Sequence, residues 1–409
     1  MKVRYWIWFW LAPLAGAQPV SSLVEEALHN NREILAAQKK VEALRQRPAR
    51  ESSLPDPTLS LGWASNGAPW PGAGLGVNPT SNLGVMVSQE VPAPGKRKLR
   101  GEIADEEAAA AFDEYLSTRL KVASRLKQAY HELHHAVVAI GYVDRYQELL
   151  NDMLRISEAR YAVGRAAQQD ILRAQTQLAI FAAQRVRFEQ EREAKQIEIN
   201  ALLNRPQGGR IEVPAEMTAG PMAASLEDLL AQARAHSPLI ERDREAAKGN
   251  ELAASLARKD YAPDYTVSGG YFNQGGLPPM WEARVDFKLP AYFWRKQRAA
   301  VAEQEASASQ ARHEYTETLV EVEAGIREQY SVAEASRKLV DLYEKSVIPE
   351  ARLAYESALA GYQAGRGDFI AVFSNFTSVV DYELTDHEEI MRFHIALAKL
   401  EELTGVEQK

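Results

Sequence analysis

One motif in the sequence has residue types and a spacing that could carry out chemistry. His131, Glu132 and His135 form an H-E-x-x-H pattern. On a helix this pattern places two imidazoles on one face, beside a glutamate that can activate a zinc-bound water. A catalytic zinc site also needs a third ligand and a concave pocket. The motif therefore raises the hypothesis of an extracytoplasmic zinc-dependent hydrolase.

The surroundings of the motif argue against that hypothesis. It lies midway along a region expected to form one long helix, where Glu148 would be roughly 20 Å from His135 and Glu158 farther still. The histidines outside the motif make no cluster in the sequence: His29, His236, His313, His387 and His394. Adventitious metal binding at the surface and an ordinary polar helix face are the alternatives. We predict no catalytic residue, no resident metal and no cofactor.

Composition narrows the class of protein. The chain has 409 residues, of which 46% are hydrophobic and 25% are charged, as expected of a folded chain. Its net charge is -8, from 48 lysines and arginines against 56 aspartates and glutamates, which excludes the basic surface typical of nucleic-acid-binding proteins. The chain has no cysteine, so disulfides, cysteine nucleophiles, thiolate metal sites and lipid attachment through cysteine are excluded.

Residues 1–17 have the features of a secretory signal peptide. Lys2 and Arg4 precede an apolar run over residues 5–16, and small residues over 15–17 resemble a cleavage site. The apolar run of about 12 residues is too short to span a bilayer, and an uncleaved anchor is the alternative. We predict a mature chain that begins near Gln18 and is located outside the cytoplasm.

The remaining chain contains an internal repeat, with two similar halves. Three landmarks occur in the same order in each half, about 200 residues apart, which is too long a period for a solenoid repeat. The pairs are Pro55-Asp56 and Pro263-Asp264, Val91-Pro92-Ala93 and Leu289-Pro290-Ala291, and Tyr161-Ala162-Val163-Gly164-Arg165 and Tyr362-Gln363-Ala364-Gly365-Arg366. A duplicated domain follows from these pairs.

We predict a mainly α fold with β strands, built from a duplicated helix–strand–strand–long-helix-hairpin repeat. The first repeat covers residues 18–203, with strands at about 57–67 and 82–91 and long helices over about 95–203. Residues 204–225, rich in proline and glycine, form the linker. The second repeat covers residues 226–409, with strands at about 264–273 and 281–290 and long helices over about 292–404.

The predicted strands alternate apolar and polar residues, as Leu59, Leu61 and Trp63 do with their neighbours. Each strand has about 9 to 10 residues, the length that crosses an outer membrane at a tilt. Four such strands could pack as a soluble sandwich. In lipid, their open edges would instead have to be completed by other copies of the chain. Dimers with 8 strands and trimers with 12 strands both satisfy the even strand number of bacterial barrels.

These landmarks together resemble the outer membrane efflux protein (TolC) family over nearly the whole chain after the signal. The residues that carry the resemblance are Pro55-Asp56-Pro57, the strand end Gln89-Glu90-Val91-Pro92 running into Gly95-Lys96-Arg97, and the two Tyr-x-x-Gly-Arg sites. The resemblance implies a homotrimer that forms a 12-stranded outer-membrane β-barrel and a periplasmic α-helical barrel. It also implies that a periplasmic adaptor (membrane fusion) protein and an inner-membrane pump dock at the far end.

The resemblance also implies roles for individual residues. The helix-hairpin tips that meet the adaptor would be Val163, Gly164, Arg165, Ala364, Gly365 and Arg366. Asp170 and Tyr362 would form a hydrogen bond that holds the periplasmic aperture closed. The family's arginine in that network falls at Gly367, where neighbouring Arg366 could replace it, and the constriction aspartates fall at Ala371 and Ser374. Taken alone, each tip glycine could be an ordinary helix end.

We therefore predict a non-enzymatic channel component of a tripartite efflux or type I secretion system. It would conduct metal ions, drugs or other small molecules passively from an inner-membrane pump, through the periplasm, to the exterior. Its predicted location is the outer membrane of a Gram-negative-type bacterium, in contact with outer-membrane lipid. The zinc-dependent hydrolase is the alternative.

Overall fold

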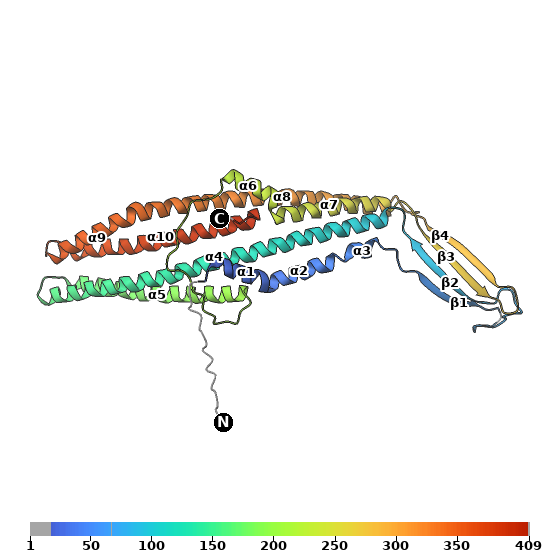
Figure 1. The fold of residues 1–409 in the computed structure, drawn as a ribbon, viewed down its shortest axis with the longest axis horizontal. Coiled ribbons are helices and arrows are strands. Elements are labelled where there is room, and N and C mark those ends of the chain that lie inside the picture. The colour runs from blue at the N-terminus through green and yellow to red at the C-terminus, as the bar shows by residue number, and fades with distance from the viewer. Residues whose placement is uncertain (1–17, 67, 408–409) are drawn as a thin grey trace, which may run out of the picture. The chain divides into compact units, whose positions relative to one another are not determined.

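The computed structural model describes residues 18–66 and 68–407 (Figure 1). The predicted signal peptide, residues 1–17, lies outside the described residues. The first half of the chain contains α1 (Val20–Asn30), α2 (Arg32–Leu44), α3 (Arg47–Ser52), β1 (Thr58–Ala64), β2 (Asn82–Val91), α4 (Lys96–Ala162) and α5 (Gln168–Leu202). The second contains α6 (Leu226–His236), α7 (Pro238–Lys259), β3 (Asp264–Asn273), β4 (Met280–Lys288), α8 (Lys296–Leu342), η1 (Tyr343–Val347), α9 (Ile348–Gln363) and α10 (Phe369–Thr404).

The chain folds into two compact units that cut across the sequence repeats. Among the described residues, the strand unit comprises 37–66, 68–116 and Pro238–Val320, and the helical unit comprises 18–36, Ser117–Ser237 and 321–407. Each unit takes elements from both halves of the chain. Each sequence repeat therefore contributes to both compact units, and neither repeat forms a separate domain.

The strand unit contains a single described sheet with the order β1-β2-β3-β4. All three pairings are antiparallel. The central β2–β3 pairing joins the two repeats, and the hydroxyls of Ser88 and Ser268 hydrogen-bond across it at 2.9 Å. Within the described chain, β1 and β4 are edge strands with a strand neighbour on one side only.

One face of this sheet is apolar and exposed. The register places Leu61 opposite Val85, Val85 opposite Tyr271, and Tyr271 opposite Trp281. Leu61 and Trp281 are 78% and 77% exposed, which is unusual for large apolar side chains in a continuous patch. The opposite face carries Arg284 and its neighbours of both charges. This alternation is the consequence of a two-residue strand period.

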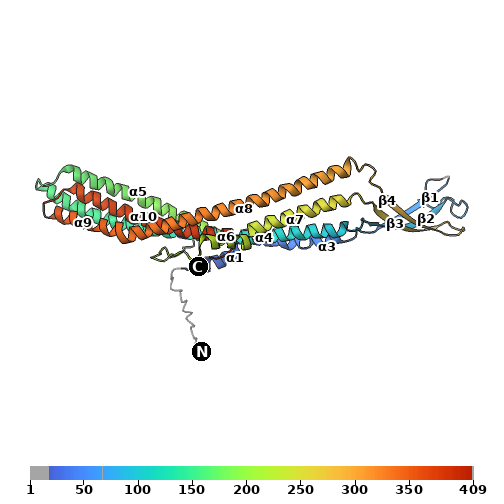
Figure 2. The same ribbon diagram turned by 90° about the horizontal axis from the view of Figure 1, so that it is seen from above.

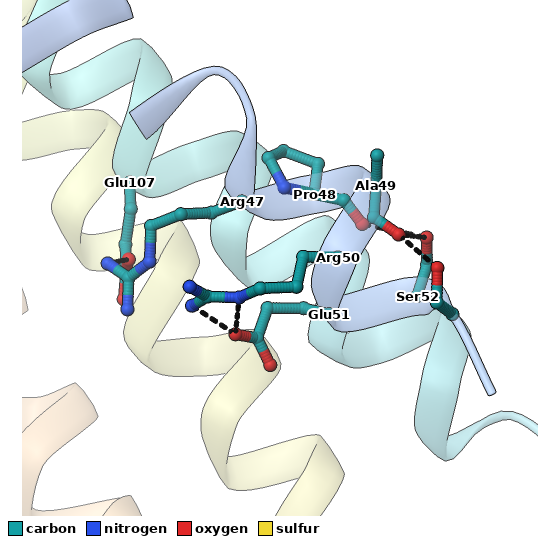
Figure 3. A network of polar contacts seen from close by, with 8 residues as sticks. Arg47, Pro48, Ala49, Arg50, Glu51, Ser52 and Glu107 are labelled. Atoms are coloured by element: carbon teal, nitrogen blue, oxygen red, sulfur yellow. Dashed lines mark hydrogen bonds and ion pairs between the residues drawn. The ribbon is translucent and has the colours of Figure 1, made fainter. Parts of the chain in front are cut away.

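Polar contacts connect α3 and the start of β3 to the long helix α4. Figure 3 shows Arg47 of α3 reaching Glu107 of α4, and the two side chains form an ion pair at 2.5 Å. At the first turn of α4, the buried ammonium of Lys96 lies 3.0 Å from Asp260 and 2.9 Å from Asp264. Because the buried ammonium would be unpaired without these carboxylates, this cluster fixes α4 against the start of β3.

The helical unit contains two antiparallel hairpins. One is formed by α4 and α5, and the other by α9 and α10, with α8 and η1 leading into α9. In both views the turns of the two hairpins lie at the same end of the unit (Figures 1 and 2). No helix among the described residues is long and apolar enough to cross a membrane.

The second long helix is interrupted, whereas a continuous helix was expected there. A π-helical turn at Tyr343–Val347 separates α8 from α9. Pro349 follows in the first turn of α9. Its ring would clash with the carbonyl group of Lys345, four residues earlier, and it has no N–H to offer that carbonyl. The wider π turn relieves this conflict without ending the helix.

Candidate functional site: the hairpin turns and the helix contacts beneath them

Backbone hydrogen bonds close the turn between α4 and α5. Gly164 has a φ of 73°, which is the left-handed conformation that favours glycine. Its N–H donates to the carbonyl oxygen of Tyr161 at 2.9 Å, and the N–H of Arg165 donates to the carbonyl oxygen of Arg160 at 2.8 Å. This pair of bonds is a Schellman motif, which ends a helix by satisfying its last carbonyl groups.

The turn between α9 and α10 has the same geometry. Gly365 has a φ of 74°, and its N–H donates to the carbonyl oxygen of Tyr362 at 3.0 Å. The N–H of Arg366 donates to the carbonyl oxygen of Gly361 at 2.9 Å. The side chain of Asp368 then caps α10 by accepting from the N–H of Ala371 at 2.8 Å. The glycines do end helices, and they end them identically in both repeats.

The residues predicted to form the tips are all exposed: Val163, Gly164, Arg165, Ala364, Gly365 and Arg366. Val163 is 67% exposed although it is apolar. The two turns therefore present a pair of matched surfaces with one cationic side chain each. Whether an adaptor binds them stays a prediction.

The structure places the predicted aperture residues in different environments. Asp170 and Tyr362 are both buried, whereas Ala371 and Ser374 are exposed on the first turns of α10. The hydroxyl of Tyr362 lies 3.4 Å from the hydroxyl of Ser157 on α4. The hydrogen bonds found among the described residues include none that joins Asp170 to Tyr362, so that contact stays a prediction.

The sequence patterns did not predict the cation that lies beside the aperture residue Tyr362. The guanidinium of Arg160, on α4, lies over the ring of Tyr362 with its carbon 4.2 Å from the ring centroid. This is the geometry of a cation–π interaction. It joins the last turn of α4 to the last turn of α9, and so connects the two repeats. The repeated Tyr-x-x-Gly-Arg landmark directed attention to Arg165 and Arg366, while Arg160 lies just before it.

An apolar core supports the turns from below. Phe369 and Phe376 of α10 are almost completely buried, as is Phe181 of α5. The rings of Tyr362 and Phe369 pack edge to face with centroids 6.0 Å apart, and those of Phe181 and Phe376 do so at 6.2 Å. This core holds both hairpins together close to their turns, which makes the tips a rigid pair.

The H-E-x-x-H residues are engaged with neighbouring elements. His131 is buried, and its Nδ1 lies 3.1 Å from the sulfur of Met217. Glu132 forms an ion pair with Lys195 of α5 at 2.7 Å, beside a cavity of about 550 Å³ that His135 also lines. Within the described ranges, no three histidine, aspartate or glutamate side chains are arranged to hold a metal ion. The geometry therefore gives the hydrolase hypothesis no support.

The expectation that His387 and His394 belong to no cluster was wrong. The ring of His394 stacks on that of His131 with centroids 4.5 Å apart. His387 receives a 2.9 Å hydrogen bond from, or donates one to, the hydroxyl of Tyr142 on α4. Both residues lie on α10, far from the motif in sequence, and α10 packs against α4. Five of the eight histidines therefore share one region of the helical unit, which sequence spacing alone could not show.

Comparison with protein families identifies the first repeat. Residues 23–205 match the model of the outer membrane efflux protein family. Over these residues, the chain is similar to this family. The predicted resemblance is confirmed for the first repeat.

Solved structures share the fold of this chain over almost all of its length. VceC of Vibrio cholerae, an outer membrane protein, superposes with a TM-score of 0.80 at 18% identity, covering 94% of this chain and 96% of that one. The CmeC outer membrane channel of Campylobacter jejuni gives 0.79 at 17% identity, covering 94% and 85%. CusC, which forms a transmembrane channel, gives 0.78 at 15% identity, covering 94% and 91%. No curated protein sequence matches the chain.

Proposed function

We propose that three copies of this chain form the exit duct of a tripartite efflux system. The duct conducts metal ions, drugs or other small molecules passively from an inner-membrane pump to the exterior. The observation that carries the proposal is the described sheet, which has one exposed apolar face and a free edge on both β1 and β4. Exposed backbone edges are not tolerated in lipid, so further copies must complete the sheet. Three copies give a 12-stranded barrel, an even number of strands.

Two exposed apolar stripes on the helical unit support assembly with further copies. On α5, Leu172, Ala179, Ala183 and Val186 lie at the three, four and seven spacings of a coiled-coil seam and are all exposed. A second stripe follows the other hairpin: Val332, Leu339, Leu342 and Leu353. Val186 is 66% exposed and Leu353 is 65% exposed. Because the two stripes differ, one copy's α5 stripe would meet the next copy's α8–α9 stripe, which gives a closed ring.

The hairpin turns are the proposed docking surface for a periplasmic adaptor. Both are exposed, both have a rigid Schellman backbone, and each presents one arginine. A partner that carries carboxylates or carbonyl groups would satisfy Arg165 and Arg366. The matched geometry lets six similar turns form one ring in a trimer, so that the adaptor meets a repeated surface.

Gating is proposed to occur where the two hairpins meet. Splaying of the turns must break the contacts of Tyr362 with Arg160 and Ser157, together with any contact that Asp170 makes in the assembled channel. The test is single-channel conductance in planar bilayers, comparing the natural protein with the double variant Asp170→Ala, Tyr362→Phe. A raised open probability supports the gate, and unchanged conductance contradicts it.

The assembly is tested by the mass of the protein in detergent. Light scattering on the protein purified from outer-membrane extracts is expected to give three mature chains per particle. The variant Leu61→Asp, Val285→Asp is expected to be lost from the outer-membrane fraction, because it places charges on the apolar face of the sheet. The matched control is Arg284→Asp on the opposite face, which should assemble normally. A monomer in the soluble periplasmic fraction would contradict the duct.

A further inference from the structure

The linker between the repeats is attached to the helical unit by histidines. Pro214, Met217 and Thr218 of the linker contact histidine side chains on α4 and α10. Because α4 belongs to the first repeat and α10 to the second, the linker lies as a strap across a contact between repeats. The contacts include two histidines of the H-E-x-x-H motif, which the proposed channel function does not use.

The first two contacts form around the stacked pair of His131 and His394. The Nδ1–H of His131 donates to the sulfur of Met217 at 3.1 Å, because a thioether can only accept. The Nε2–H of His394 donates to the carbonyl oxygen of Thr218 at 3.1 Å. The two rings are parallel within 8°. Each ring therefore commits one N–H to the linker and one face to its neighbour.

His134 makes the third contact. Its ring faces the backbone of Pro214, where the carbonyl oxygen is the only polar backbone group. The residue is 3% exposed, and its Nε2 is buried without a hydrogen-bond partner. The neutral tautomer suits this position, because it needs one donor and leaves one bare nitrogen. A second proton would create a buried N–H at Nε2 that has no hydrogen-bond acceptor.

The titratable groups that face these three rings disfavour a positive charge, whereas the backbone of Pro214 raises the pKa of His134 and that of Thr218 raises the pKa of His394. From α4 they are Lys127 and the neighbouring imidazole of His135, and from α10 they are His387 and the stacked ring itself. Burial, followed by these neighbours, lowers the pKa of His131 to about 3 and that of His134 to about 4. Burial also lowers the pKa of His394.

The nearby carboxylates face other groups. Glu132 of α4 pairs with Lys195 of α5. Glu191 of α5 and Glu388 of α10 face His135, and Glu383 of α10 faces His387.

We propose that the inter-repeat linker is an acid-released strap, held across α4 and α10 at neutral pH by the uncharged imidazoles of His131, His134 and His394. Protonation of these rings detaches the linker and frees α4 to move relative to α10. The strap goes beyond the proposed channel, since it requires neither the trimer nor any conducted substrate. Its contacts lie within the helical unit of one chain.

The size of the effect follows from linkage. A histidine that regains its ordinary pKa of about 6.5 when the linker leaves binds protons more tightly in the released state. With a pKa of about 4 in the held state, as for His134, the ratio of released to held linker rises about 20-fold between pH 7 and pH 5. A second such histidine multiplies the ratio again. Release is therefore expected to be steeper than the titration of a single group.

The experiment uses the absence of cysteine in the chain. A single Ala215→Cys substitution, at an exposed linker position, carries a nitroxide in the full-length protein in detergent. Electron paramagnetic resonance is expected to show an immobilised label at pH 7.5 and a growing mobile component below about pH 6. The same label at Glu328→Cys, an exposed position on α8, reports any general loss of structure and should not change.

Variants whose side chains cannot titrate distinguish release of the linker by histidine protonation from other effects of acid. His131→Phe preserves the ring stack, and His134→Asn preserves a donor for Pro214. The double variant is expected to lower the released fraction at pH 5 by at least tenfold. His394→Gln, tested alone, is a milder variant that keeps the donor to Thr218. The matched control His313→Gln removes an exposed histidine of α8 and should leave the pH response unchanged.

The proposal is overturned if the linker label stays immobilised down to pH 4.5. It is also overturned if the double variant and His394→Gln release the linker at the same pH as the natural chain. A release that coincides with mobility at Glu328→Cys would show general acid unfolding and would equally contradict the strap. These outcomes do not depend on the conductance of the channel at neutral pH. The strap and the proposed channel function can therefore be refuted independently of each other.

Discussion

The α4–α5 hairpin and the α9–α10 hairpin share one backbone turn but bury different polar groups. Helix α5 buries Asp170 near its start and Asn200 near its end, and the rest of its buried positions are apolar. Helix α10 buries Glu383, Asp386 and Glu389 at successive intervals of three residues. The turn depends on glycine and a few hydrogen bonds, so both hairpins can form it. The buried side chains differ because each helix faces different neighbours.

The carboxylates of α10 obtain their partners from three surrounding elements. Glu383 accepts from Arg352 of α9 at 2.8 Å and from the hydroxyl of Tyr146 of α4. Glu389 accepts from the hydroxyl of Ser336 on α8 at 2.6 Å. Asp386 lies between them with a buried oxygen that has no partner. Helix α10 therefore adds buried charged groups to its apolar packing, whereas most buried residues of α5 are apolar.

The largest predicted effect removes the cation that pairs with Glu383. Arg352→Ala leaves a carboxylate that is 2% exposed without its charge partner, which is expected to lower the free energy of unfolding by about 3–5 kcal/mol. The matched change in the first hairpin is Arg155→Ala, whose partner Asp152 is exposed and whose loss should cost about 0–1 kcal/mol. Chemical denaturation of both variants checks the difference, and equal costs would break the comparison.

The next predicted effect is a pH dependence of the free energy of unfolding that arises from Asp386. Burial, then the charges of Glu344 and Glu383, raises the pKa of Asp386 to about 7. The folded state thus binds this proton more tightly than the unfolded state, whose Asp has a pKa of about 3.9. The stabilisation is fully present below about pH 4 and is lost as pH rises to about 7, by about 2–4 kcal/mol. Asp386→Asn should abolish this part of the pH slope in thermal unfolding, and an unchanged slope would contradict it.

The two turns should respond alike to loss of glycine. Gly164→Ala and Gly365→Ala each place a side chain at a φ near 73°, which is expected to cost about 1–2 kcal/mol. An added Cβ meets nothing within 4 Å at Gly164 and only the end of the Arg160 side chain at Gly365. Unfolding measurements should therefore give the same cost within about 0.5 kcal/mol. A larger gap would show that the turns are not equivalent in the protein.

The smallest effect tests the contact between the hairpins. A double-mutant cycle of Arg160→Ala and Tyr362→Leu is expected to give a coupling energy of about 0.5–2 kcal/mol. Tyr362 is 5% exposed, so the interaction is screened little by solvent. A coupling near zero would show that Arg160 only covers the ring. The control pair Arg160→Ala with Leu353→Ala, whose leucine is 65% exposed, should be additive.

Local features of the fold were readable from the sequence, and contacts between distant segments were not. The strand β3 lies at Asp264–Asn273, where alternation and the flanking turns had placed it, because a two-residue period leaves a direct trace in the sequence. The π turn at Tyr343–Val347 left no such trace, although Pro349 marked its cause. The stacking of His131 on His394, and of Arg160 on Tyr362, depends on how α4 packs against the second hairpin. No spacing within one segment encodes those pairs.

The centre of the sheet has a consequence for how the protein is made. The pairing of β2 with β3 joins residues such as Ser88 and Ser268, which are 180 positions apart, so the first β-hairpin is synthesised long before its partner. Closing so long a loop is slow compared with forming a helical hairpin. Until the second repeat emerges, the edge of β2 remains a template for pairing with any other chain. Folding of this protein is therefore expected to rely on chaperones that shield that edge until the second repeat has been made.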